Sequence, residues 1–129
     1  MAQIKIYGRK SALATKRQAL SDAIHASVVE ALQFPSDKHF HRFISLERDE
    51  FIHPLDRSDD YIIIEISMFE GRSADTKKHL IRLLFENIAA RTVISPGDIE
   101  ITIFETPKVN WGIRGLPADE LGLSYKVEI

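Results

Sequence analysis

Three cationic side chains occupy positions in which they could hold a small anion. Arg72 lies in the turn Gly71-Arg72-Ser73, Lys38 follows a Pro-x-Asp sequence, and Arg114 lies between two glycines. Guanidinium and ammonium groups bind carboxylates and enolates through charge-assisted hydrogen bonds. Arg72 has the strongest case, because the turn fixes it and the Gly-Arg pair recurs as Gly8-Arg9. The alternative for all three is a solvated surface position.

Two further features could bind a ligand or an ion. Trp111 could form one wall of a pocket, and the alternative is a packing residue at a subunit contact. His39 and His41 could ligate zinc as neighbours two residues apart, but the sequence places no third ligand beside them. His25, on a predicted helix, is expected to face solvent, and the carboxylates of residues 48–60 follow no metal-loop spacing. The sequence therefore predicts no metal site and no cofactor.

A strand, a turn and a helix between residues 61 and 90 position Arg72. Alternate apolar residues predict a strand with one apolar face: Ile62, Ile64, Ile66 and Met68. Gly71 supplies the turn and Ser73 is a favourable N-cap. Apolar residues at helical spacing then predict a helix that packs on the strand: Leu80, Ile81, Leu84, Phe85 and Ile88.

The same order of elements occurs earlier in the chain. Residues 4–7 predict a strand, Gly8-Arg9-Lys10-Ser11 predicts its turn, and residues 13–33 predict a helix. Each of the two helices ends before a Pro-x-Asp sequence, and strands are predicted next, at residues 39–47 and 99–104. A duplicated β-α-β unit is the favoured interpretation, and chance alignment of two ordinary units is the alternative.

The predicted fold is α+β in two layers, with a four-stranded mixed sheet and two helices on one face. We expect a single domain. Its parts are repeat one at about residues 2–48, a loop at about 49–60, repeat two at about 61–105 and a C-terminal tail at 106–129. The tail is expected to contain a short strand at residues 124–129, and to close over a pocket or reach a neighbouring subunit.

Composition excludes several classes of function. The chain has 129 residues, 44% of them hydrophobic and 28% charged, which is ordinary for a globular domain. A net charge of -2 gives no electrostatic basis for binding nucleic acid. There is no cysteine, hence no disulfide, and no apolar run approaches membrane-spanning length. We expect a cytoplasmic protein that has neither a membrane nor a nucleic acid as partner.

The sheet face opposite the helices predicts self-association. The residues expected on it are Lys5, Tyr7, His41, Phe43, Glu65, Ser67, Glu100 and Thr102. This face is too apolar for free solvent and too polar for a dry core, so association of several subunits about an axis is expected. The basic residues at the start of the first helix, including Arg9, are expected to form a solvated face.

Several short motifs together resemble the tautomerase superfamily, whose fold is shared with macrophage migration inhibitory factor. They are Phe34-Pro35, Gly71-Arg72-Ser73 followed by Lys77, Ser95-Pro96-Gly97-Asp98, and Glu105 followed by Asn110-Trp111-Gly112. The chain looks most similar to the malonate semialdehyde decarboxylase-like branch. The resemblance implies a homotrimer with active sites at subunit interfaces, and acid or base chemistry by an N-terminal proline.

The sequence departs from that family pattern at three positions. Ala2 stands where the catalytic proline is expected, and Glu70 stands where one of two arginines is expected. Lys38 aligns with the branch's aspartate, although a shift of one residue would place Asp37 there. If Met1 is removed, the Ala2 amine, whose ordinary pKa lies near 7.7–8.0, could still serve as a general base.

Two classes of function follow from these observations. The first is an isomerase acting on a small carboxylate-bearing keto or enol compound, with Ala2 and Arg72 catalytic and Lys38, Trp111 and Arg114 binding the substrate. Decarboxylation is a less favoured reaction. The alternative is a non-catalytic trimeric protein that binds a small molecule and has lost the proline-dependent chemistry.

Overall fold

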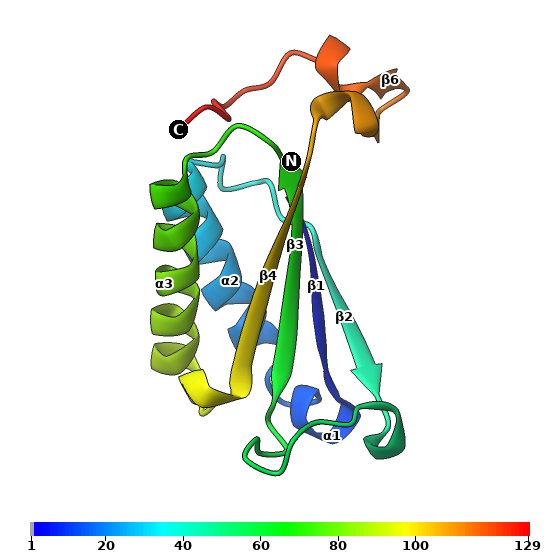
Figure 1. The fold of residues 1–129 in the computed structure, drawn as a ribbon, viewed down its shortest axis with the longest axis vertical. Coiled ribbons are helices and arrows are strands. Elements are labelled where there is room, and N and C mark those ends of the chain that lie inside the picture. The colour runs from blue at the N-terminus through cyan, green and yellow to red at the C-terminus, as the bar shows by residue number, and fades with distance from the viewer. Residues whose placement is uncertain (1) are drawn as a thin grey trace.

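The computed structural model describes residues 2–129, which form one sheet layer and one helix layer with a small hairpin at one end (Figure 1). The strands are β1 (Ala2–Arg9), β2 (His41–Leu46), β3 (Ile62–Phe69), β4 (Ile99–Thr106), β5 (Gly112–Ile113) and β6 (Leu116–Pro117). The α-helices are α1 (Lys10–Leu13), α2 (Arg17–Leu32) and α3 (Ala74–Arg91). Short 3-10 turns occur at Arg48–Glu50, Pro96–Asp98, Lys108–Asn110 and Ala118–Glu120. Within the described residues, no helix is long and apolar enough to cross a membrane.

The sheet confirms the predicted fold class and the duplicated unit. Its strand order is β2-β1-β3-β4. Strand β1 pairs in parallel with β2, and β3 pairs in parallel with β4, so each pair with its connecting helix is one β-α-β unit. The two units meet through the antiparallel pairing of β1 with β3. Helices α2 and α3 both cover the same face of this mixed sheet (Figure 1).

The core lies between the sheet and the two long helices. Ile62, Ile64, Ile66 and Met68 are fully buried on the helix side of β3, as their alternation predicted. Helix α3 begins at the predicted cap, because the Ser73 hydroxyl accepts a hydrogen bond from the Thr76 amide. The first predicted helix is divided: α1 ends at Leu13 and α2 begins at Arg17, with the Lys16 amide donating to the Leu13 carbonyl in a tight turn between them.

The predicted orientation of β2 was wrong. His41 and Phe43 were expected on the open face, but they pair in register with Ile4 and Ile6, whose side chains are buried on the helix side. Phe43 accordingly packs against the core. Parallel pairing with β1 selects this face, because residues directly opposite one another on paired strands point the same way. The open face does carry Tyr7, whose hydroxyl donates to Glu65 Oε1 at 2.6 Å.

The expectation that Arg9 is solvated was also wrong. Arg9 is buried, forms an ion pair with Asp59 and donates a hydrogen bond to the Phe51 carbonyl at 3.5 Å. The loop before β3 therefore folds back over the end of β1. Part of the negative charge of this loop neutralises basic residues at the end of β1 and before α2, because Asp60 also forms an ion pair with Lys16 at 3.0 Å.

The C-terminal tail folds back over the start of α3. The Ser73 hydroxyl donates to the Ile129 carbonyl at 3.0 Å, and Val127 is buried against the turn at Gly71. Gly71 has φ +132, and a Cβ there would lie 2.9 Å from Val127 Cγ1, so glycine is needed both for conformation and for space. The predicted strand at residues 124–129 was wrong, because none of these described residues is in a strand.

Candidate functional site

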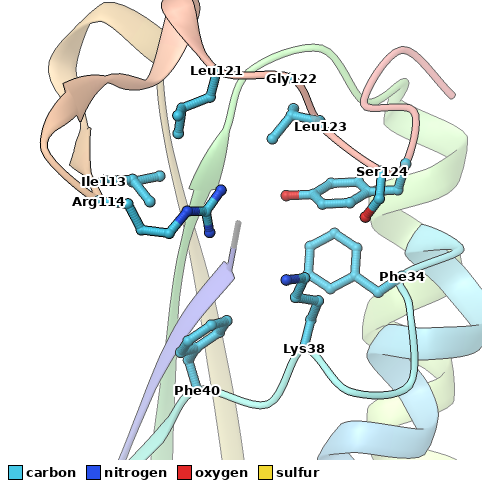
Figure 2. A pocket seen from close by; sticks show the side chains of 10 residues that line it. Phe34, Lys38, Phe40, Ile113, Arg114, Leu121, Gly122, Leu123 and Ser124 are labelled. Atoms are coloured by element: carbon cyan, nitrogen blue, oxygen red, sulfur yellow. The ribbon is translucent and has the colours of Figure 1, made fainter.

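A cavity of about 230 Å³ opens between the tail, the hairpin and the segment that leads into β2. Its lining residues are Phe34, Lys38, Phe40, Ile113, Arg114, Leu121, Gly122, Leu123, Ser124 and Tyr125. Figure 2 shows Lys38 and Arg114 extending into the same space from different segments, between apolar walls. Among the described residues, the lining contains no aspartate or glutamate. Two cations and an apolar wall suit a small organic anion.

The turn after α2 positions Lys38. Helix α2 ends at Leu32, the C-cap residue Gln33 has a left-handed φ of 54, and Phe34 then turns inward and is buried. The Lys38 amide donates to the Pro35 carbonyl at 3.1 Å, which closes a turn and directs the next residues toward β2. Asp37 is exposed and does not line the cavity. The cavity therefore contains the lysine and not the neighbouring carboxylate.

The hairpin β5–β6 positions Arg114. Ile113 pairs with Leu116, so Arg114 and Gly115 are the two residues of a tight turn, and both have positive φ, 48 and 87. A two-residue hairpin turn of this kind favours Asn-Gly or Gly-Gly, because an arginine pays a steric cost at positive φ. The turn places the Arg114 guanidinium inside the cavity at the expense of backbone strain (Figure 2).

Arg72 lies next to the cavity but does not line it. Its side chain is only 4% exposed, its guanidinium carbon is 5.5 Å from the centre of the Phe34 ring, and Nη1 donates to the Phe69 carbonyl at 3.2 Å. Nε and Nη2 have no hydrogen-bond partner within residues 2–129. Burial lowers the pKa of Arg72, and the charges of Glu105 and Glu128 oppose that shift. Phe34 thus separates a buried cation from the cavity.

The two Gly-Arg pairs of the duplicated unit differ in their partners. Arg9 pairs with Asp59, whereas Arg72 forms no ion pair among the described residues. Glu105, one of the two carboxylates whose charge acts on Arg72, is bound by Lys77, whose Nζ lies 2.7 Å from Glu105 Oε1. The second arginine is therefore the one that is buried without an ion-pair partner.

Ala2 is buried in the core beside the cavity. It is 4% exposed, pairs with Met68 in the sheet, and does not line the cavity. The Ile4 amide donates to the carbonyl of Phe40, a lining residue, at 3.0 Å. The start of β1 thus reaches the base of the site, as Figure 2 shows.

Trp111 belongs to the packing of the tail. Its ring meets Phe69 edge to face at 5.1 Å, and its Nε1 donates to Thr106 Oγ1 at 2.7 Å. It does not line the cavity. Of the five predicted site residues, Lys38 and Arg114 line the cavity together. Ala2, Arg72 and Trp111 do not line it.

The sequence allowed the tail to close over a pocket, but sequence reasoning did not name the residues that form this wall. Leu121, Leu123 and Tyr125 contribute to the cavity, and the Tyr125 ring lies 4.6 Å from that of Phe34. Their alternation with Gly122 and Ser124 was visible in the sequence as a period of two. That period indicated an extended segment with one apolar side, but not which surface it covers.

Comparison with known proteins decides the family. The sequence model of the tautomerase enzyme family matches residues 38–114, which is more than half of the chain. The protein belongs to the tautomerase family. The chain is 25% identical over 116 residues to the probable tautomerase YusQ of Bacillus subtilis, covering 86% of this chain and 91% of that protein. It is 38% identical over 58 residues to the 2-hydroxymuconate tautomerase of Pseudomonas putida, covering 45% of this chain and 92% of that protein.

Solved structures share the fold of this chain. Malonate semialdehyde decarboxylase superposes with a TM-score of 0.79 at 20% identity, covering 89% of this chain and 93% of the other. Native fused 4-OT also gives 0.79 at 20% identity, covering 94% and 99%. Because the Pseudomonas enzyme matches 45% of this chain over nearly its whole length, its size is that expected for one β-α-β unit. The resemblance to the tautomerase superfamily drawn from the motifs is confirmed.

Proposed function

We propose that this protein binds a small keto or enol compound bearing a carboxylate in the cavity between Lys38 and Arg114. The observation that carries this proposal is the convergence of two cations from distant segments on one apolar-walled cavity without a carboxylate in its described lining. One cation would hold the substrate carboxylate, and the other would stabilise the oxygen that becomes negative in the enolate.

Tautomerisation moves one proton between carbon and oxygen, so it needs a base as well as these cations. We propose that the amine of Ala2, exposed by loss of Met1, supplies that base, because the start of β1 reaches the base of the cavity. Arg72 would act from behind Phe34 as a positioning residue, whose positive charge, buried without an ion pair among the described residues, favours an anion in the cavity.

A specific observation favours the alternative of binding without catalysis. The Ala2 side chain is packed in the core, and it lacks the ring that fixes the backbone of an N-terminal proline. A primary amine on a freer backbone would be positioned less accurately for proton transfer. Under this alternative Lys38 and Arg114 keep their binding roles, and no proton is transferred.

We also propose that the protein assembles as a homotrimer through the open face of its sheet. Two structures of fused 4-OT that share this fold are trimers, at TM-scores of 0.76 and 0.78. The open face carries the Tyr7–Glu65 pair, and Phe104, the outermost aromatic on it, is 48% exposed. A monomer by light scattering across micromolar concentrations would contradict this assembly.

Calorimetric titration with phenylpyruvate tests the proposed binding. Lys38→Ala and Arg114→Ala should each weaken binding by roughly 10-fold or more, since a hydrogen bond to a charged group contributes about 1.5–3 kcal/mol. Lys78→Ala removes an equal charge from an exposed site on α3 and should leave the affinity unchanged. Equal affinities for all three variants and the parent would refute the site. An enol–keto assay on the same samples separates catalysis from binding.

A further inference from the structure

Three histidines converge on the helix side of the sheet edge, apart from the cavity. His25 lies on α2, His39 precedes β2, and His41 is the first residue of β2. One ring nitrogen from each lies within 4.8 Å of those of the other two, and we call this group the histidine cluster. His39 Nε2 is 3.1 Å from His41 Nδ1. The third ligand that the sequence did not place for His39 and His41 is thus supplied by the packing of α2.

The partners of His25 leave one of its nitrogens available for a ligand. His25 Nε2 is 2.8 Å from the Ser36 carbonyl oxygen, which can only accept, so Nε2 carries the hydrogen. His25 Nδ1 is buried without a hydrogen-bond partner among the described residues. In the neutral ring this nitrogen has a free lone pair. A ligating histidine characteristically donates its other N–H to a carbonyl or carboxylate in this way, which fixes the tautomer and the ring.

We propose that the histidine cluster binds one divalent transition-metal ion of the zinc type. Zinc and the neighbouring divalent first-row transition metals bind three imidazoles and leave one position open for water. Tetrahedral zinc with bonds of about 2.0–2.1 Å needs ligand nitrogens about 3.3 Å apart, close to the His39–His41 separation of 3.1 Å. The Ser21 hydroxyl lies 2.9 Å from His39 Nε2 and 2.8 Å from His41 Nδ1, where it can bind a water in the fourth position.

Binding requires one local adjustment. The rings of His25 and His39 are stacked, with centroids 4.2 Å apart and an angle of 7° between their planes. An ion lies in the plane of each ring that binds it, so two parallel rings cannot share one. His39 is exposed and lies outside regular structure, so its side chain can rotate until the plane of its ring contains an ion that His25 and His41 also bind.

The charge beside the cluster also suits a cation. The carboxylate of Asp22 lies close enough to His39 for its negative charge to act on that ring. A metal ion bound by the histidine cluster would therefore have a negative charge beside it.

Metal binding would also restrain one wall of the cavity. Successive residues of the segment leading into β2 alternate in direction: Lys38 and Phe40 line the cavity, whereas His39 and His41 belong to the cluster. An ion joining this segment to α2 would fix the positions of Lys38 and Phe40. The metal site itself does not depend on what the cavity binds.

Titration of untagged, EDTA-treated protein with Zn²⁺, followed by Co²⁺ absorption spectra, tests the proposal. We expect one ion per chain and a Co²⁺ visible spectrum of tetrahedral type. Since loss of an outer-shell partner alone costs about 10–100-fold in affinity, His39→Ala and His25→Ala should each weaken binding at least about 10-fold. His79→Ala, an exposed histidine on α3, should leave the affinity unchanged.

Two results would overturn the site: no saturable Zn²⁺ binding by the parent protein, or equal affinity in the His39→Ala and His79→Ala variants. His39 is exposed, so its truncation should leave the fold intact, and circular dichroism of each variant verifies this. If His25→Ala unfolds, the comparison of His39→Ala with His79→Ala still decides the question.

Discussion

Replacing Arg114 with asparagine should separate the strain of the hairpin turn from the use of the charge. Arg114 has φ 48, and a left-handed conformation costs an ordinary L-residue about 1–2 kcal/mol. Asparagine tolerates this conformation, and Asn-Gly is a preferred pair in such turns. We therefore expect Arg114→Asn to raise the free energy of unfolding by about 1 kcal/mol, which for a domain of this size raises Tm by about 4 °C.

The same substitution should weaken ligand binding. Arg114 lines the cavity, and its loss removes a hydrogen bond to a charged group, which contributes about 1.5–3 kcal/mol. The expected increase in Kd is about 10- to 150-fold. Titration with phenylpyruvate measures this effect. Guanidinium unfolding followed by fluorescence of Trp111, the one tryptophan of the chain, measures the stability.

Arg82→Gln is the matched control, because it removes an exposed arginine of α3 at negative φ. It should change neither stability nor affinity appreciably. If Arg114→Asn binds phenylpyruvate as tightly as the parent, Arg114 is not a ligand contact. If it destabilises the protein, the contacts of the arginine outweigh the strain of its backbone, and the reasoning from the turn is refuted.

Three further predictions concern the neighbourhood of the cavity. Arg72→Met should change the free energy of unfolding by less than about 1 kcal/mol. The substitution loses the cation–π contact with Phe34 and one hydrogen bond to the Phe69 carbonyl, but it also removes two buried nitrogens, Nε and Nη2, that have no hydrogen-bond partner among the described residues. Denaturant titration measures this, and a loss above about 3 kcal/mol would show that the guanidinium is fully satisfied. Ala2→Pro should raise kcat/KM for phenylpyruvate tautomerisation once mass spectrometry shows that Met1 is removed. An inactive processed variant would favour binding without catalysis. In EDTA, the free energy of unfolding should fall as the pH drops from 6.5 to about 4. Burial lowers the pKa of His41 in the folded protein to about 4, so the unfolded chain takes up a proton at a higher pH than the folded chain does. Allowing for the partial exposure of His41, the loss is about 2 kcal/mol, and a His41→Gln variant should show a flatter pH profile.

Local patterns predicted the fold because each repeat contains a strand whose two faces differ. Ile64, Ile66 and Met68 alternate with Glu65 and Ser67, which indicates the buried side of β3. In β2 the neighbours Phe43 and Ile44 are both apolar, so alternation could not choose between the two faces. Pairing with β1 makes that choice, and pairing is a long-range property that a local pattern does not contain.

The lining of the candidate site could be predicted only in part, because it too depends on packing between distant segments. Lys38 and Arg114 could be named because each lies in a recognisable turn. The burial of Arg72 depends on the tail, which packs against Gly71 from more than fifty positions away in the chain. The histidine cluster depends on α2 lying beside β2, which brings His25 to two residues that the sequence had already paired. Non-local packing thus decided which candidates share a site.

The duplicated fold explains why one end of the sheet carries the cavity. In each repeat a Gly-Arg pair lies at the end of the first strand or just beyond it, and antiparallel pairing of β1 with β3 sends the two arginines to opposite ends of the sheet. At one end the loop before β3 brings Asp59 into an ion pair with Arg9. At the other end the tail buries Arg72 without an ion pair among the described residues, although the charge of Glu128 acts on it, and the tail then forms a cavity wall opposite Lys38. A buried cation without an ion-pair partner lowers stability unless an anion binds near it. The end of the sheet with the unpaired arginine is therefore where a carboxylate ligand gains the most, and it is where Lys38 and Arg114 converge.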